Sequence, residues 1–83
     1  MTGEVRIVIC HRRWVFVGFL SREENEMVLR RAKVLRRWGT TAGLGQLALK
    51  GPQRDTVLDA CGVVEAHPLS IVMRVPCEAM KWN

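Results

Sequence analysis

Hydrophobic and polar positions alternate along much of this chain, and the alternation predicts a small sheet. Over residues 4–10 the odd positions Val5, Ile7 and Ile9 lie on one side of an extended segment rich in β-branched residues. Residues 11–13 form a polar turn, and residues 14–20 (WVFVGFL) are apolar at nearly every position, which is typical of a strand buried on both faces. Gly18 within this segment indicates a bend, a bulge or the close approach of another backbone.

The next segments predict a hairpin and then a short helix. Residues 21–26 (SREENE) are a charged hairpin loop. Residues 27–35 fit both alternation and a near-helical spacing, but the β-branched Val28 and Val34 favour a strand. After a loop at 39–45, apolar spacing predicts a helix of about two turns from Leu44 to Lys50, ended by Gly51-Pro52.

The last third of the chain predicts further strands. Residues 57–66 are apolar but broken at Gly62, which is consistent with two short strands or with one bulged strand. His67-Pro68 requires an extended or turn conformation, residues 69–75 form the last strand, and the following tail has room for one helical turn.

These elements predict a single domain over residues 1–83, of the mostly-β to α+β class. The expected architecture is a small curved antiparallel sheet of four to five strands with one short helix packed against it. A chain of this length buries only roughly 60–65% of the surface that its unfolded form exposes. We therefore expect a homo-oligomer, most simply a symmetric dimer, that uses spare apolar surface near Trp14 and the C-terminal segment.

Charge is distributed unevenly along the chain. The net charge is +5, yet no acidic residue occurs between Glu26 and Asp55. That interval holds seven basic residues: Arg30, Arg31, Lys33, Arg36, Arg37, Lys50 and Arg54. The asymmetry favours an anionic partner, although a solvated face that only maintains solubility remains the alternative.

Two arginines precede a tryptophan within this basic stretch. If the segment is a regular strand, Arg36 and Arg37 point to opposite faces, and Arg30, Arg36 and Trp38 share one face. A pair of guanidinium groups beside an indole can clamp a phosphate and stack a base. The competing interpretation places Trp38 in the core.

The loop at 39–45 (GTTAGLG) is rich in glycine and leads into the predicted helix. Loop amides at the start of a helix can bind phosphate. The loop lacks the Gly-Lys-Ser/Thr ending of a P-loop, so a turn that needs the backbone freedom of glycine is the favoured interpretation. Taken together, the candidate ligand-binding residues are Arg30, Arg31, Arg36, Arg37, Trp38, Thr40, Thr41 and Gly43.

The sequence holds no pattern that indicates catalysis or metal binding. Its cysteines lack metal-ligand spacing and its two histidines are far apart in sequence. Cys10 and His11 are neighbours, but adjacent strand residues point to opposite faces and cannot act as a nucleophile and base. We expect no enzyme activity, no metal, no cofactor and no transmembrane segment, and we expect a cytoplasmic protein with free thiols.

Residues 32–51 resemble the core motif of a family of small, functionally uncharacterised proteins encoded by phages and prophages. The matching positions are Ala32, Lys33, Leu35, Trp38, Leu44, Gln46, Leu47, Ala48 and Gly51. The segment 71–77 matches the family's isoleucine-rich strand more loosely, while Arg36, Arg37 and Gly43 depart from the pattern. The resemblance implies a sheet with one short helix, and a phage-encoded protein active in the host cytoplasm.

The function predicted from these features is that of a non-catalytic binding protein. The first hypothesis is sequestration of an anionic nucleotide, such as a host immune signalling nucleotide, by a homo-oligomer; this rests on analogy with other small phage proteins. The alternatives are a nucleic-acid-binding accessory protein that uses the basic 27–54 surface, and a protein–protein inhibitor of a host factor.

Overall fold

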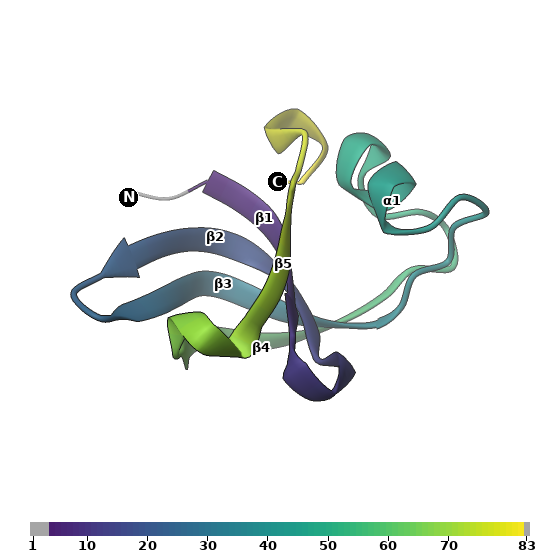
Figure 1. Cartoon of the computed structure of the whole chain (residues 1–83). Helices are drawn as coiled ribbons and strands as arrows, with labels where there is room; N and C mark the ends of the chain where they lie inside the picture. The colour runs from purple at the N-terminus through teal and green to yellow at the C-terminus, as the bar shows by residue number, and fades with distance from the viewer. Residues whose placement is uncertain (1–3, 83) are drawn as a thin grey trace.

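The fold is a five-stranded antiparallel sheet with one short helix (Figure 1). The computed structural model describes residues 4–82, apart from the side chain of Arg13. In chain order the elements are β1 (Glu4–Cys10), β2 (Val15–Glu23), β3 (Glu26–Arg37), α1 (Leu44–Lys50), β4 (Val57–Ala66) and β5 (Ile71–Pro76). Short 3-10 turns cover His11–Arg13, Pro68–Ser70 and Ala79–Lys81.

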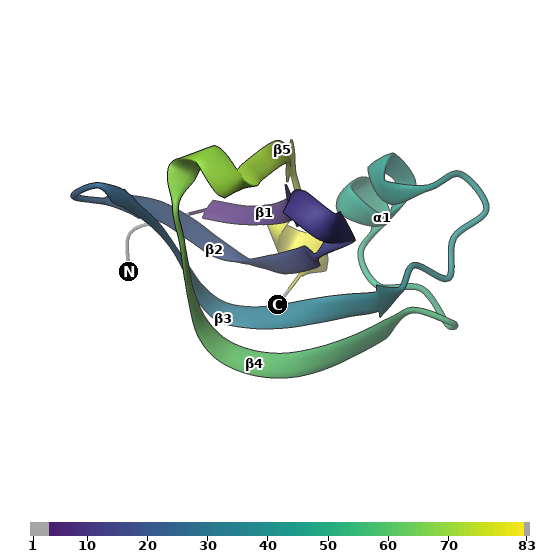
Figure 2. The same ribbon diagram turned by 60° about the horizontal axis from the view of Figure 1, so that its bottom comes forward.

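The strands lie in the order β4-β3-β2-β1-β5. The first four form a meander, whereas β5 returns across the molecule to pair with β1, where Ile7 lies opposite Val75. Figure 2 shows that the sheet is strongly curved, with β3 and β4 bending beneath β1 and β2. The sheet therefore ends in two unlike strands, β4 on one side and β5 on the other.

Each face of the sheet carries its own apolar cluster. On the face that α1 covers, the helix-side cluster consists of Val5, Ile7, Val15, Val17, Leu35, Leu47 and Ala48. The opposite face carries a smaller buried cluster of Val8, Leu29 and Ala32. The alternation predicted for residues 4–10 and the two-faced burial predicted for residues 14–20 are both confirmed, except that Trp14 itself is 56% exposed.

A bulge in β3 moves side chains from one face to the other. In a regular strand Leu29 and Leu35 would share a face, but Leu29 packs in the opposite-face cluster and Leu35 in the helix-side cluster. The register shifts between Leu29 and Ala32, and Arg31 lies in the left-handed region at φ 51°. The prediction that Arg30, Arg36 and Trp38 share one face is therefore wrong, because the bulge adds one residue between the two arginines.

Gly18 on β2 faces this bulge. A Cβ atom at Gly18 would lie 2.9 Å from the carbonyl oxygen of Arg30, so only glycine permits the approach of the two backbones. The close approach predicted from the sequence is confirmed.

The helix has the predicted bounds, and other boundaries differ slightly. Residues 21–26 are mostly strand, because β2 runs to Glu23 and β3 starts at Glu26 around a two-residue turn. Residues 57–66 form one strand, with Gly62 at φ 78°. The last strand starts at Ile71 and not at residue 69, since Pro68–Ser70 close a 3-10 turn in which the His67 side chain accepts a hydrogen bond from the Leu69 amide.

Candidate functional site

The β3 bulge places Arg31 on the helix-side face next to Lys33. A left-handed conformation costs a non-glycine residue roughly 1–2 kcal/mol. Arg31 nevertheless adopts it, with the backbone on either side held by pairing to β2 and β4. Residues with strained backbone conformations cluster at functional sites. The surroundings of Arg31 are therefore a candidate site.

Arg31 and Lys33 line a cavity of about 270 Å³ together with Phe19 and Trp82. Both basic side chains belong to exposed residues, and neither forms an ion pair with another residue that the structure describes. Phe19 and Trp82 are half-buried and pack at the border of the helix-side cluster. Two cations and two aromatic rings, from β2, β3 and the C-terminal turn, thus meet around one hollow.

Trp82 is held in place by the end of α1. Its indole Nε1–H donates a hydrogen bond to the Ala48 carbonyl oxygen at 3.1 Å, and the Glu78 amide donates to the same oxygen at 2.8 Å. These bonds satisfy a carbonyl that a helix C-terminus leaves without an intrahelical partner. The turn that carries Trp82 is therefore docked on the helix by directed contacts.

Gly51 allows this docking. It ends α1 at φ 80°, and a Cβ atom there would lie 2.4 Å from the carbonyl oxygen of Lys81. No side chain fits at this position, so the glycine that stops the helix also admits the C-terminal turn.

Arg30 has an intramolecular partner. Its guanidinium donates hydrogen bonds to Glu23, one of them at 3.2 Å, and Ser21 also donates to Glu23. The hydrogen bonds from Arg30 and then Ser21 lower the pKa of Glu23 below its usual range, and the Glu23 carboxylate raises the pKa of Arg30. Arg30 is therefore committed to the β2–β3 hairpin and lies apart from the cavity.

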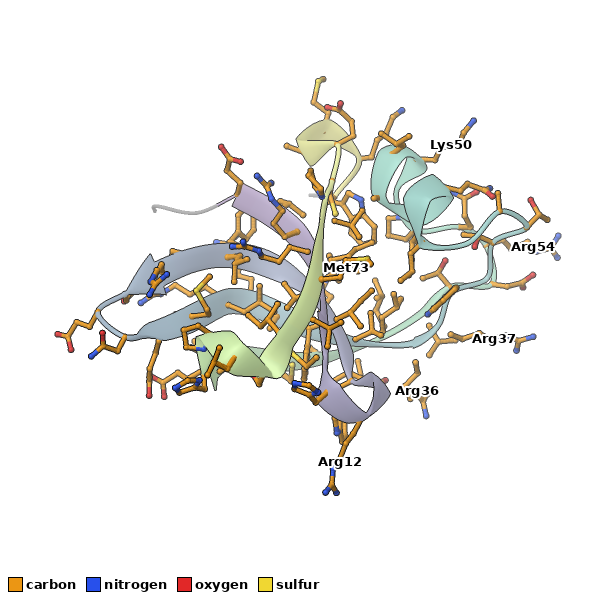
Figure 3. The ribbon with its side chains drawn as sticks, viewed as in Figure 1. Arg12, Arg36, Arg37, Lys50, Arg54 and Met73 are labelled. Atoms are coloured by element: carbon orange, nitrogen blue, oxygen red, sulfur yellow. The ribbon has the colours of Figure 1, made fainter. Side chains whose placement is uncertain are left out.

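Arg36 and Arg37 also lie away from the cavity. The Arg36 Nε is 2.6 Å from the Asp59 carboxylate of β4, whereas Arg37 forms no ion pair with a described residue. Figure 3 shows these two arginines pointing in different directions at the end of β3, while Lys50 and Arg54 extend outward from α1 and from the loop that follows it. These cations fan out and do not converge on one position.

Trp38 lies beyond the end of β3 and is 43% exposed, so its interpretation as a core residue is wrong. The chain leaves the sheet here, and the Thr56 hydroxyl fixes the turn by donating to the Trp38 carbonyl oxygen at 2.6 Å.

The glycine-rich loop is occupied by its own hydrogen bonds. The Thr40 hydroxyl donates to the Gly43 carbonyl oxygen at 3.0 Å and accepts from the Gly43 amide at 3.1 Å. The side-chain oxygen of Gln46 accepts from the Ala42 amide at 2.8 Å and from the Thr41 hydroxyl at 3.3 Å. Gly39 and Gly43 both have positive φ, so the loop matches the interpretation as a turn that needs glycine.

The two partly buried thiols, Cys10 and Cys77, are poorly suited to nucleophilic chemistry. Burial raises the pKa of Cys77 to about 11 and also raises that of Cys10, so both are protonated at neutral pH. Within residues 4–82, no group of three or more potential metal ligands comes together. No helix in that part of the chain is long and apolar enough to cross a membrane.

No protein-family model, curated protein or solved structure matches this chain. The resemblance to phage-encoded proteins therefore stays a prediction.

Of the eight predicted ligand-binding residues, Arg31 is the one that lines the cavity with the aromatic rings. Sequence reasoning missed Lys33, Phe19 and Trp82 as its neighbours, because the last of these approaches only through the docking of the C-terminal turn. Gly51 was the available signal, since a glycine can mark both a helix end and a close backbone contact.

Proposed function

We propose that this chain is a non-catalytic binding protein for an anionic nucleotide, and that the ligand occupies the cavity between Phe19, Arg31, Lys33 and Trp82. The observation that carries the proposal is the meeting of two cations without ion-pair partners among the described residues and two aromatic rings around one hollow. A guanidinium and an ammonium group bind phosphate by charge-assisted hydrogen bonds, and an indole presents a flat face on which a base stacks.

The cavity's size favours one nucleotide unit over a polymer. Its volume of about 270 Å³ is near the lower end of the range typical of small-molecule sites, roughly 300–1,000 Å³. A polymer would need a continuous basic track, whereas Arg30 and Arg36 are ion-paired and Arg37, Lys50 and Arg54 diverge (Figure 3).

The biological setting follows from the resemblance to phage proteins and from analogy. In that setting the protein acts in the host cytoplasm by sequestering a host signalling nucleotide, and it needs neither a cofactor nor a metal. The raised pKa values of Cys10 and Cys77 support a role in binding over one in catalysis.

Calorimetric titration with the four ribonucleoside monophosphates tests the proposal. We expect binding that saturates at one ligand per chain, with uncharged nucleosides and ribose 5-phosphate each at least about tenfold weaker, because each lacks half of the interaction. Arg31→Ala should weaken binding roughly ten- to hundredfold, as expected for the loss of a charge-assisted hydrogen bond, whereas Arg54→Ala should not change it.

A single-stranded oligonucleotide titrated at several salt concentrations tests the alternative. Affinity that grows with oligonucleotide length and falls steeply with salt would favour the nucleic-acid-binding function over the proposed one. If Arg31→Ala and Arg54→Ala both change nucleotide affinity by the same small amount, the ligand does not bind in the cavity.

A further inference from the structure

The free edge of β5 borders a groove on the face opposite to α1. Arg22 and Arg74 line two adjoining cavities, of about 340 and 540 Å³, and Met27 lines both as well. Ile71 and Leu20 contribute apolar surface to one cavity each. Neither Arg22 nor Arg74 forms an ion pair with another described residue, so the groove offers two available positive charges beside apolar side chains. The larger cavity is also lined by Glu4 and Arg6, which pair with each other.

The backbone of β5 adds hydrogen-bonding capacity to this groove. The Cys77 amide points to β1, where it donates to the Val5 carbonyl oxygen at 3.2 Å. Alternation then directs the amide and carbonyl of Arg74 outward, away from β1, and Pro76, which has no amide hydrogen, occupies the next outward position. An incoming extended segment can therefore pair with the backbone at Arg74.

The other edge strand of the chain has the complementary chemistry. β4 carries two carboxylates, Asp59 and Glu65, and no basic residue. Val64 packs in the opposite-face cluster, so Val63 and Glu65 share the other face of β4. Val63 is 60% exposed and Glu65 is also exposed, which gives an apolar side chain and a carboxylate two residues apart on a free edge.

We propose that the β5 groove receives β4 of a second copy of this chain, with Glu65 of the second copy at Arg22 and Arg74 and with Val63 against the apolar side chains of Met27 and Ile71. Charge selects this pairing over the two symmetric ones. Asp59 is paired with Arg36 of its own chain, so Glu65 is the β4 carboxylate that forms no ion pair with another described residue, and two β4 edges would offer it no basic β4 residue. Two β5 edges would bring Arg74 against its own copy. A β5–β4 contact is heterologous, so each copy keeps one free edge of each kind and assembly continues to a ring or a chain. The groove itself lies on the other face from the nucleotide cavity, and the proposal does not depend on that cavity.

Sedimentation velocity over a range of protein concentrations tests the proposal. We expect the unmodified protein to form species larger than the 9.4 kDa monomer. Arg74→Glu and Glu65→Arg should each weaken self-association about tenfold, because each turns an attractive cross-strand pair into a repulsive one. An equimolar mixture of the two variants, and the variant that carries both changes, should regain association, since opposite charges then meet again.

Arg54→Glu is the matched control, because it makes the same change in net charge at an exposed loop position, and it should leave assembly unchanged. Circular dichroism and thermal melting identify any variant that fails to fold. In that case Arg74→Ala or Glu65→Ala replaces it, and we expect a smaller loss of self-association. The proposal is overturned if the unmodified protein is a monomer at all concentrations. It is also overturned if only one of the two charge reversals weakens self-association, which would indicate a symmetric contact.

Discussion

The face of the sheet that α1 covers differs from the face that it leaves open. The helix-side cluster joins seven buried residues from three strands and the helix, including Ile7 and Leu47 with no exposed surface. The opposite-face cluster has three buried residues. The candidate nucleotide cavity lies at the border of the larger cluster, and the proposed docking groove lies on the other face. The fold therefore places Arg31, one of three described non-glycine residues with positive φ, beside its best-packed region, where the surrounding structure can hold that conformation.

The largest effect expected is from removing the helix's main contact with the sheet. Leu47 is fully buried, so Leu47→Ala should lower the free energy of unfolding by about 3–5 kcal/mol through lost burial and a new cavity. Leu49→Ala, at a position that is 66% exposed on the same helix, should change it by less than about 0.5 kcal/mol. Urea denaturation of both variants measures the difference, and similar losses would mean that α1 does not pack through Leu47.

Two glycine substitutions, one inside α1 and one at its end, should have opposite effects on stability. Gly51→Ala should cost about 2 kcal/mol or more, because of the positive φ and the 2.4 Å contact with Lys81. Gly45→Ala, inside α1 with open space around it, should stabilise the protein by about 0.5–1 kcal/mol. Thermal melting should therefore give shifts of opposite sign. A Gly51→Ala protein as stable as the unmodified one would show that the C-terminal turn does not need this contact.

The strained residue gives a smaller change in stability that should separate folding from binding. Arg31→Gly removes the cost of the left-handed conformation, so stability should stay equal or rise by up to about 1 kcal/mol, while nucleotide affinity falls roughly ten- to hundredfold. Urea denaturation and calorimetric titration of one preparation measure both quantities. If Arg31→Gly destabilises the protein strongly, Arg31 has a structural role and not the proposed one.

The smallest expected effect concerns the ion pair of the β2–β3 hairpin. Because the pKa of Glu23 is lowered in the folded protein, the pair contributes stability above the ordinary glutamate range and loses it as the pH falls through the lowered value. The urea midpoint of Glu23→Gln should therefore lie slightly below that of the unmodified protein at pH 7, and the gap should close in strong acid. A gap that is independent of pH would show that the charge of Glu23 does not contribute to stability.

Local signals in the sequence were sufficient to predict most of the fold. The spacing of Leu44, Leu47 and Ala48, with the Gly51-Pro52 stop, gave the bounds of α1, and alternation with β-branched residues gave the strands. What could not be predicted depends on tertiary structure. The sequence carries no local signal for the bulge at Arg31, because neighbouring strands impose its left-handed conformation. The bulge places Arg30 and Arg36 on opposite faces, whereas the sequence predicted one shared face.

The candidate site was harder to predict than the fold for the same reason. Arg31 was identified through charge density, but its aromatic neighbours come from β2 and from a turn that docks on the helix end. Trp38 had the stronger sequence signal, as a tryptophan directly after two arginines, and yet it lies outside the sheet with 43% of its surface exposed. The order of residues along a chain does not reveal which tryptophan the fold brings to a cation.

The pairing of β1 with β5 has a consequence for folding kinetics. The β1–β2 and β2–β3 pairs can form through short hairpins, but the β1–β5 ladder joins segments almost a full chain length apart, such as Ile7 and Val75. Closing so large a loop costs entropy that is recovered only when the ladder forms, so β5 should dock late and on a slower timescale than the hairpins. Until it does, β1 is the unpaired edge strand of the partly formed sheet, and its residues are largely β-branched. This transient species, and not the native state, is where off-pathway aggregation of the chain should begin.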